Sequence, residues 1–226
     1  MTTLFITGID TDIGKTVACG VMAKTMLHRG YSVYTQKIVE TGCENGVSND
    51  LLEHEKIVGK PFNHEEIALH CPYRFTTAVS PHLSAQRDGK KIDENYLAQQ
   101  MRRLSSKTDH LLVEGAGGLC VPLNEKVMIV DFIQEQGLPI VLVTSPRLGS
   151  INHTLLTLSL CESKDIDVRA IIYNHYPNVR NWMREDTCTV LKAELKRRFS
   201  KALWLDLNNN SEVFHFTQDE MNTLLG

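Results

Sequence analysis

The sequence predicts a doubly wound α/β domain with a mostly parallel sheet. Short, apolar, β-branched runs alternate with longer helical patterns along all 226 residues, and no repeat, low-complexity tract or linker interrupts the alternation. Runs such as VLV are apolar on both faces, which is typical of a parallel sheet that helices cover on both sides. Alternation of strands and helices is typical of doubly wound domains. We therefore expect residues 1–226 to form a single domain.

The expected elements follow one another in a regular order. TLFIT is the first expected strand and PIVLVT is a later one, and both are rich in apolar and β-branched residues. The expected strands are 3–7, 32–39, 110–114, 139–144 and 168–173. The expected helices lie near 15–29, 93–107, 126–136, 150–163 and 180–199.

The segment from Thr41 to Ser80 departs from this alternation because it is polar and shows no clear period. We expect an irregular insertion there, and the conformation of 43–75 stays open. An insertion of that length in a compact domain is more often functional than idle.

Composition excludes several classes of protein. A formal net charge of −3 provides no basic field that would attract nucleic acid. The six cysteines form no Cys-x-x-Cys pair, which argues against zinc ribbons and thioredoxins and fits a reducing compartment. No signal peptide is visible, and no stretch approaches the roughly 20 apolar residues that span a bilayer. We expect a cytoplasmic protein without a membrane or nucleic-acid partner.

The stretch GIDTDIGKTV, residues 8–17, joins the first strand to the first helix. Gly8 and Gly14 let the backbone curl so that its N–H groups form an anion nest, and the helix adds its positive N-terminal end. Lys15 in such a loop reaches the outer phosphates of a nucleotide, and the Thr16 hydroxyl binds Mg²⁺. Five residues separate the glycines instead of the usual four. The alternative is an ordinary strand-to-helix turn.

Two charged residues end neighbouring strands. Glu114 ends the strand in HLLVEGAGG, where a carboxylate facing the phosphate loop can hold Mg²⁺ directly or through water. Lys37 ends the second strand, and a second ammonium beside a phosphate site can gather the negative charge of phosphoryl transfer. The alternatives are a solvated carboxylate followed by a glycine turn, and a solvated lysine.

Two later segments also suggest ligand contacts. In PRLGSINHTLLT, residues 146–157, Ser150 or Asn152 is expected to cap a helix whose start is another anion site, and a plain capped helix is the alternative. In IIYNHY, Asn174 lies just past a buried strand, where its amide can bond an adenine edge.

These motifs together resemble those of the dethiobiotin synthetases. GIDTDIGKT is similar to the family's G-T-D-T-[ED]-V-G-K-T loop, which has the same five-residue spacing. The resemblance covers roughly residues 1–176 and continues through QKIVETG, ND at 49–50, SPHLSAQRDGKKI, VEGAGGLCVPL and LGSINHTLLT. It implies a P-loop NTPase-like fold, with ATP and Mg²⁺ as cofactors.

The resemblance also implies a reaction. One amine of 7,8-diaminononanoate takes up CO₂ to give a carbamate, ATP phosphorylates the carbamate to a carbamic–phosphoric anhydride, and the second amine closes the cyclic urea of dethiobiotin. ADP and phosphate are released. Members of the family are homodimers that bind this substrate at the subunit interface, and so a homodimer is expected.

Roles for individual residues follow from the same resemblance. The expected catalytic residues are Lys15 and Lys37, and the expected Mg²⁺ ligands are Thr16, Asp50 and Glu114. Residues expected at the nucleotide are Asp12, Ile13, Gly14, Lys15, Thr16, Val17, Asp50, Glu114, Gly115, Ala116, Gly117, Asn174, His175, Leu203, Trp204 and Leu205. Residues expected at the substrate are Thr11, Asp12, Lys37, Thr41, Ser80, Pro81, Gly118, Gly149, Ser150, Ile151 and Asn152, of which the last four face the tail of the partner's substrate.

The sequence departs from the family pattern at three places. Ile38 stands where the family commonly has proline, and Glu40 is also unusual. The segment KALWLDLNNN, residues 201–210, lacks the glycine and proline of the turn that completes the family's adenine pocket. The nucleotide preference is therefore open.

Three rival functions are weighed against this one. A partition or cell-division ATPase would carry another lysine before Lys15, and none is present. The amidotransferases of cobyrinate and cobyrate synthesis need a fused glutaminase domain, which this chain does not show. A nucleotide-binding regulatory protein without turnover is favoured only by the altered 201–210 segment, and the charged residues of the phosphate site argue against it.

Overall fold

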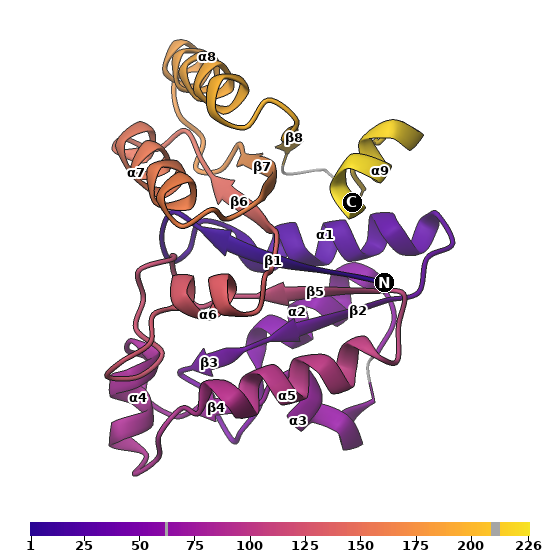
Figure 1. Ribbon diagram of the computed structural model, residues 1–226, viewed down its shortest axis with the longest axis vertical. Helices are drawn as coiled ribbons and strands as arrows, with labels where there is room; N and C mark the ends of the chain where they lie inside the picture. The colour runs from indigo at the N-terminus through magenta and orange to yellow at the C-terminus, as the bar shows by residue number, and fades with distance from the viewer. Residues whose placement is uncertain (62, 209–212) are drawn as a thin grey trace.

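A six-stranded parallel sheet forms the centre of the molecule in the computed structural model (Figure 1), which describes residues 1–61, 63–208 and 213–226. The strands lie in the order β2-β5-β1-β6-β7-β8, and each neighbouring pair is parallel. Their bounds are β1 (Thr2–Gly8), β2 (Val33–Lys37), β5 (His110–Glu114), β6 (Ile140–Thr144), β7 (Val168–Asn174) and β8 (Leu203–Leu207). The predicted α/β fold class with a doubly wound, mostly parallel sheet is confirmed.

Helices cover the sheet on both faces. One face packs against α5 (Glu94–Ser105), α6 (Ile129–Glu135), α7 (Ser150–Ser163) and α8 (Asn181–Arg198). The other face packs against α1 (Lys15–His28) and α9 (Gln218–Leu225), and α2 (Asn49–Val58) lies on α1. No helix in 1–61, 63–208 or 213–226 has the length and apolar character needed to cross a membrane.

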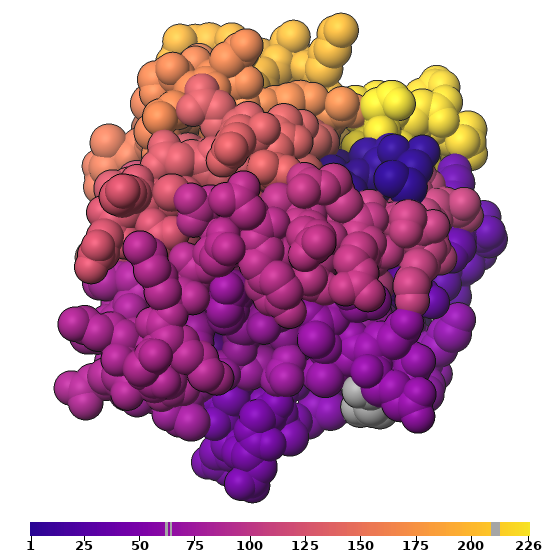
Figure 2. Space-filling view, turned by 60° about the horizontal axis from the view of Figure 1, so that its bottom comes forward, coloured from indigo at the N-terminus to yellow at the C-terminus, as the bar shows by residue number. Residues whose placement is uncertain are grey.

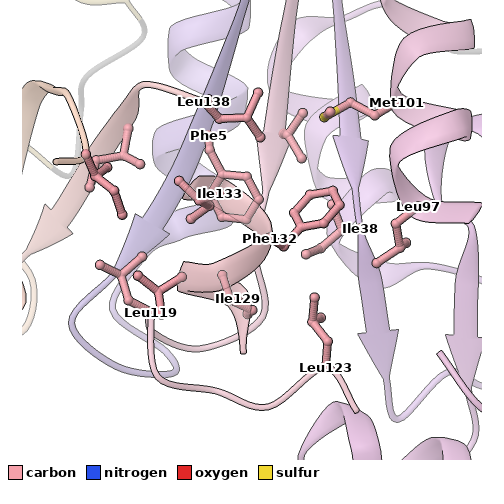
Figure 3. Close-up of a cluster of buried hydrophobic side chains, with 14 of the residues drawn as sticks. Phe5, Ile38, Leu97, Met101, Leu119, Leu123, Ile129, Phe132, Ile133 and Leu138 are labelled. Atoms are coloured by element: carbon pink, nitrogen blue, oxygen red, sulfur yellow. The ribbon is translucent and has the colours of Figure 1, made fainter. Parts of the chain in front are cut away.

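Alternate residues of the strands enter two separate cores. Phe5 of β1 packs with Phe132 and Ile133 of α6, and with Leu97 and Met101 of α5, in the cluster shown in Figure 3. Its neighbours along β1 enter the opposite cluster, which contains the apolar face of α1. Because successive side chains of a strand point to opposite faces, a central strand buried on both sides must be apolar throughout.

Strand register places the functional ends of the strands side by side. Ile6 of β1 and Lys37 of β2 both pair with Glu114 of β5, and Gly8 pairs with Val143 of β6. The chain leaves β1 toward β2 on one side, whereas β6 lies on the other side of β1. In open α/β sheets, ligands bind beyond the carboxyl ends of the strands at such a switch point.

The prediction of an irregular segment from Thr41 to Ser80 is wrong. The segment contains α2, a short 3-10 turn η1 (His64–Glu66), α3 (Ile67–His70) and β4 (Tyr73–Phe75), and β4 pairs with β3 (Val39–Thr41) in a separate two-stranded sheet. Helix α2 buries only two residues, Leu51 and His54, so its apolar period is too weak to be seen. Its end signals were present, because Ser48 caps its N-terminus and Gly59 ends it with a left-handed φ of 74°.

Several expected boundaries also need correction. The strand expected at 32–39 is divided at Ile38 into β2 and β3, and the helix expected at 126–136 is limited to α6. The 201–210 segment, for which no strand was predicted, contains β8, while 209–210 lie outside the described residues. Neither Ser150 nor Asn152 caps α7, since its N-cap is Gly149 with φ 94° and no side-chain cap bond. Helices α4 (Pro81–Arg87) and α9 were not predicted.

The N-terminal and C-terminal ends of the chain lie next to each other. The hydroxyl of Thr2 donates to the carbonyl of Leu225 at 2.8 Å. Figure 2 shows the first residues of the chain directly beside the last helix. This contact ties the end of α9 to the start of β1, while α9 packs on β7 and β8.

The start of α2 provides a test of how this segment is held. Ser48 is buried, accepts a bond from Leu51 N at 3.2 Å and donates to the carboxylate of Glu40. We expect Ser48→Ala to lower the free energy of unfolding by about 1–2 kcal/mol, because both bonds are lost. Hydrogen exchange of the Asn49, Asp50 and Leu51 amides should become faster.

Thr217→Ala is the matched control, since Thr217 caps α9 in the same way by accepting from Glu220 N at 3.1 Å. It should cost about 1 kcal/mol and leave amide exchange at the start of α2 unchanged. Unchanged stability and exchange in Ser48→Ala would show that α2 is held by other contacts.

Candidate active site

A cleft of about 830 Å³ opens at the carboxyl edge of the sheet. Its walls come from the phosphate loop after β1, the end of β2, β3, the start of α2, residues 78–81 and the loop after β5. The predicted site residues that line it are Thr11, Asp12, Gly14, Lys15, Thr16, Val17, Lys37, Thr41, Asp50, Ser80, Pro81, Glu114, Ala116 and Gly117. Residues from six separate segments are thus brought together where the sequence predicted a nucleotide site.

The phosphate loop curls over the start of α1. Asp12 and Gly14 have left-handed φ values of 52° and 96°, and Gly14 packs so tightly that a Cβ there would meet Asn174 Nδ2 at 2.4 Å. No side chain caps α1, so the first N–H groups of the helix remain available to an anion. The Lys15 ammonium turns back and donates to the carbonyl of Asp10 at 2.7 Å.

Three oxygen-bearing side chains converge beside this loop. Thr16 Oγ1 lies 2.9 Å from Asp50 Oδ1 and 3.0 Å from Glu114 Oε1. A hydroxyl and two carboxylates form a hard oxygen donor set of the kind that Mg²⁺ prefers. The predicted metal ligands therefore fit a magnesium ion in kind and in mutual distance.

A cationic side chain already lies between the two carboxylates. Lys37 Nζ is 2.5 Å from Asp50 Oδ2 and 2.8 Å from Glu114 Oε1, and it also donates to the carbonyl of Gly115 at 3.1 Å. Lys37 and Glu114 are both buried. The position between the carboxylates is thus strongly favourable for positive charge.

The charge states of these residues follow from their surroundings. Burial works to raise the pKa of Glu114, but Lys37 and His54 hold that pKa well below its usual range. Burial works to lower the pKa of Lys37, but Glu114 and Asp50 raise it above its usual value. Burial, together with the neighbouring Lys37, lowers the pKa of Lys15 to about 8. Glu114 and Lys37 are therefore charged at neutral pH, and Lys15 titrates close to it.

Behind the phosphate loop, Asn174 connects two loops. Its Nδ2 donates to Ile13 O at 2.9 Å, and its Oδ1 accepts from Tyr176 N at 3.1 Å. An amide has a second N–H and a second lone pair, which remain for a ligand. His175, the next residue, bonds Asp206 Oδ1 through Nε2 at 2.8 Å.

Other predicted site residues lie outside the cleft. Leu203, Trp204 and Leu205 are within β8, paired with β7 and two or more residues before the strand ends at Leu207, so their contact with a nucleotide stays a prediction. The start of α7 also lies apart from the cleft lining, and its predicted residues are Gly149, Ser150, Ile151 and Asn152.

The glycines after β5 have a structural reason to be glycine. A Cβ on Gly115 would meet the Phe5 ring at 2.7 Å, and a Cβ on Gly118 would meet the carbonyl of Gly8 at 3.0 Å. These two glycines therefore let the loop after β5 approach β1 and the phosphate loop. Their contact with a ligand stays a prediction.

Two buried residues beside the predicted metal ligands were not among the predicted site residues. Glu40 accepts from Asn49 N at 2.8 Å, and burial raises the pKa of Glu40 despite the bond from Ser48. His54 bonds Glu114 Oε2 through Nε2 at 2.9 Å. Burial works to lower the pKa of His54, but Cys19 and Glu114 raise it above 6.5. A prediction of α2 would have revealed His54, because it follows Asp50 by one helical turn.

Known proteins resemble this chain over nearly its full length. A family model described as an AAA domain matches residues 2–219. The chain is 42% identical over 203 residues to ATP-dependent dethiobiotin synthetase BioD 2 of Haemophilus ducreyi, covering 89% of this chain and 96% of that protein. It is 47% identical over 175 residues to the protein of the same name in Haemophilus influenzae, covering 77% of this chain and 91% of that protein.

A relative from another organism and a solved structure extend the comparison. The chain is 43% identical over 209 residues to ATP-dependent dethiobiotin synthetase BioD of Chlorobaculum tepidum, covering 92% of this chain and 87% of that protein. Among solved structures, the MinC:MinD cell division protein complex of Aquifex aeolicus aligns with a TM-score of 0.49 and 13% identity over 99% of this chain and 78% of that chain. That structural likeness is too remote to bear on function.

The lowered pKa of Lys15 gives a measurable consequence. Phosphate oxygens beside an ammonium favour its charged form and raise its pKa. Because the pKa of Lys15 in the free protein is about 8, ATP binding should take up about half a proton at pH 8 and about a tenth at pH 7. Calorimetric titration in buffers of different ionisation enthalpy measures this uptake.

Lys15→Arg is the control, because a guanidinium stays charged throughout this pH range. Its binding of ATP should be weaker and take up no proton from position 15. The same uptake at pH 8 in the wild-type protein and in Lys15→Arg would assign the titrating group elsewhere.

Proposed function

Because this chain belongs to the family of ATP-dependent dethiobiotin synthetases, we propose that it closes the cyclic urea of dethiobiotin from 7,8-diaminononanoate, CO₂ and ATP. The observation that carries the proposal is the group formed by Lys37, Thr16, Asp50 and Glu114 within one cleft beside the phosphate loop. A nucleotide-binding regulator without turnover has no need for a second buried ammonium at this position.

We assign the charge work of the reaction to the two lysines and the loop. The first N–H groups of α1 bind the phosphates, and Lys15 exchanges the carbonyl of Asp10 for the outer phosphate. Lys37 stands beside the group that is transferred and offsets its negative charge. Mg²⁺ held by Thr16, Asp50 and Glu114 would supply further charge compensation at the phosphate oxygens.

The protein supplies no covalent nucleophile in this proposal. Its task is to hold the diamine carbamate in line with the terminal phosphate and then to hold the second amine near the activated carbonyl, which makes ring closure intramolecular. The cleft walls also keep water from the anhydride, which hydrolyses readily. Binding and orientation are therefore the main sources of rate.

We place the diamine at the end of the cleft lined by Thr11, Asp12, Thr41, Ser80 and Pro81. Gly118, which packs on the carbonyl of Gly8, is kept as a further substrate candidate. Asp12 is exposed within the phosphate loop, where a carboxylate would repel phosphate unless a positive substrate group lies between them. An amine of the substrate is such a group.

We place the adenine near Asn174 and His175, next to the loop that Asn174 fastens. The free N–H and lone pair of the Asn174 amide suit the edge of a base. Leu203, Trp204 and Leu205 are kept as apolar candidates of the same pocket.

All six cysteines are free in the part of the chain that the structure describes, which supports a cytoplasmic location.

We further propose that two chains form a homodimer through the start of α7, with residues 149–152 reaching the substrate of the partner. Leu148 and Leu156 are 91% and 62% exposed, so this surface presents apolar side chains to solvent. Large exposed apolar side chains near one another often mark an interface. A surface that serves the partner's site also explains why Gly149 to Asn152 do not line this chain's own cleft.

The activity is tested directly by incubating the protein with 7,8-diaminononanoate, bicarbonate, Mg²⁺ and ATP. Dethiobiotin should be detected by its mass, and Lys15→Ala and Lys37→Ala should each lower turnover by about 10²–10³, as for loss of a preorganised charge donor. Parallel reactions with GTP and CTP test whether the proposed base pocket selects adenine.

Lys56→Ala is the matched control, since Lys56 lies on α2 with 75% of its side chain exposed. Its turnover should equal that of the wild-type protein. No dethiobiotin from the wild-type protein, or near-normal turnover in Lys37→Ala, would contradict the proposal.

The dimer is tested by light scattering of Leu148→Glu combined with Leu156→Glu. The wild-type protein should show the mass of two chains, and the double variant the mass of one, because burying two carboxylates at an interface is costly. Leu52→Glu, at a residue of α2 that is 42% exposed, should remain dimeric. A monomeric wild-type protein would refute the interface.

A further inference from the structure

Helix α2 presents two functional side chains to the cleft side of the molecule. His54 follows Asp50 by four positions, so the two side chains lie one above the other on the same helical face. Asp50 contacts Thr16 and Lys37, as described above. His54 reaches past them to Glu114 from a position where only 1% of the residue is exposed.

The two oxygens of Glu114 have different partners. Oε2 lies 2.9 Å from Nε2 of His54. Oε1 lies 2.8 Å from Lys37 Nζ and 3.0 Å from Thr16 Oγ1. His54 thus holds the carboxylate through Oε2, while Oε1 faces the phosphate loop and the proposed cation position.

Such a hold is needed because the carboxylate is fully buried. The last torsion of a glutamate side chain is broad, so a carboxylate without a fixed partner can rotate. A buried oxygen without a hydrogen bond also costs free energy. A donor at Oε2 removes both difficulties and leaves Oε1 in one orientation.

We propose that His54 is a positioning residue of the metal site: its Nε2–H fixes Glu114 so that the other carboxylate oxygen is directed at the cation beside Thr16. The proposal rests on the proposed function in that Glu114 is taken as a magnesium ligand. Partners that orient metal-binding carboxylates commonly contribute about 10- to 100-fold to metal affinity.

A resident soft metal is the competing interpretation. The ligand atoms of Cys19, His54 and Glu114 lie within 4.8 Å of one another, and all three residues are buried. Sulfur, nitrogen and oxygen donors together suit zinc. The 2.9 Å between His54 Nε2 and Glu114 Oε2 is, however, a hydrogen-bond distance, and it favours a direct bond between the two side chains.

The test compares two amide variants of different reach. Gln carries its N–H at about the distance of a histidine Nε2 from the backbone, whereas Asn stops one atom short. We expect His54→Asn to weaken Mn²⁺ binding about tenfold or more in the presence of a non-hydrolysable ATP analogue, as measured by the electron paramagnetic resonance of free Mn²⁺. His54→Gln should restore affinity to within about threefold of the wild-type protein.

A turnover measurement adds a second signature. In His54→Asn the Mg²⁺ concentration for half-maximal rate should rise, while KM for the diamine at saturating Mg²⁺ should stay unchanged. A purely structural role would lower thermal stability in both variants and would not separate Gln from Asn. The stability of each variant is followed by thermal unfolding.

Equal Mn²⁺ affinity in the wild-type protein and His54→Asn would overturn the proposal, as would a His54→Gln variant as weak as His54→Asn. About one zinc ion per chain in the purified wild-type protein would overturn it in favour of a zinc centre. The wild-type product assay reports separately on the proposed function, so failure of that function and failure of the positioning role are distinguishable.

Discussion

The buried carboxylate of Glu114 is the constraint on which the site depends. An ionised carboxylate without partners is strongly disfavoured in a protein interior. Here an ammonium from β2, a hydroxyl from α1 and an imidazole from α2 all bond to it. Each partner comes from a different element. All three bonds to Glu114 therefore form only when β2 and β5 pair in the observed register and both helices are in place. A slip of β5 by one residue would turn this carboxylate to the other face of the sheet.

The sheet topology explains why opposite charges meet at this edge. Strand β1 lies between β5 and β6, and the loop after β1 leads directly into α1. No side chain caps the N-terminus of α1. This end of the helix attracts anions. The neighbouring strands β2 and β5 end in Lys37 and Glu114, which together with Asp50 create a place that attracts cations. A phosphate chain is negatively charged and suits the start of α1. A metal ion bound to that chain is positively charged and suits the place formed by these side chains.

The sequence was sufficient for the sheet and the phosphate loop because their signals are local. Apolar strands and a Gly-Lys-Thr turn are visible within a few residues. The sequence was insufficient for α2, whose buried face has only Leu51 and His54, and therefore for the contact of His54 with Glu114, 60 residues away in the chain. Glu40 was noticed only as a departure from the family, because its partners at the start of α2 are defined by tertiary contact. Lys37 and Glu114 were predicted, but their pairing required the parallel register.

The charged groups of the site already have partners within the protein. Lys15 donates to the carbonyl of Asp10, and Arg147 pairs with the carboxylate of the same residue, which keeps the Asp10 pKa below its usual value. In the proposed function, binding of a triphosphate would therefore exchange one contact of Lys15 for another and leave the Lys15 ammonium paired. The net gain of such an exchange is small compared with the strength of each bond in isolation. Since a bond from an ammonium to a neutral carbonyl is weaker than one to phosphate, the proposed exchange favours a polyphosphate ligand.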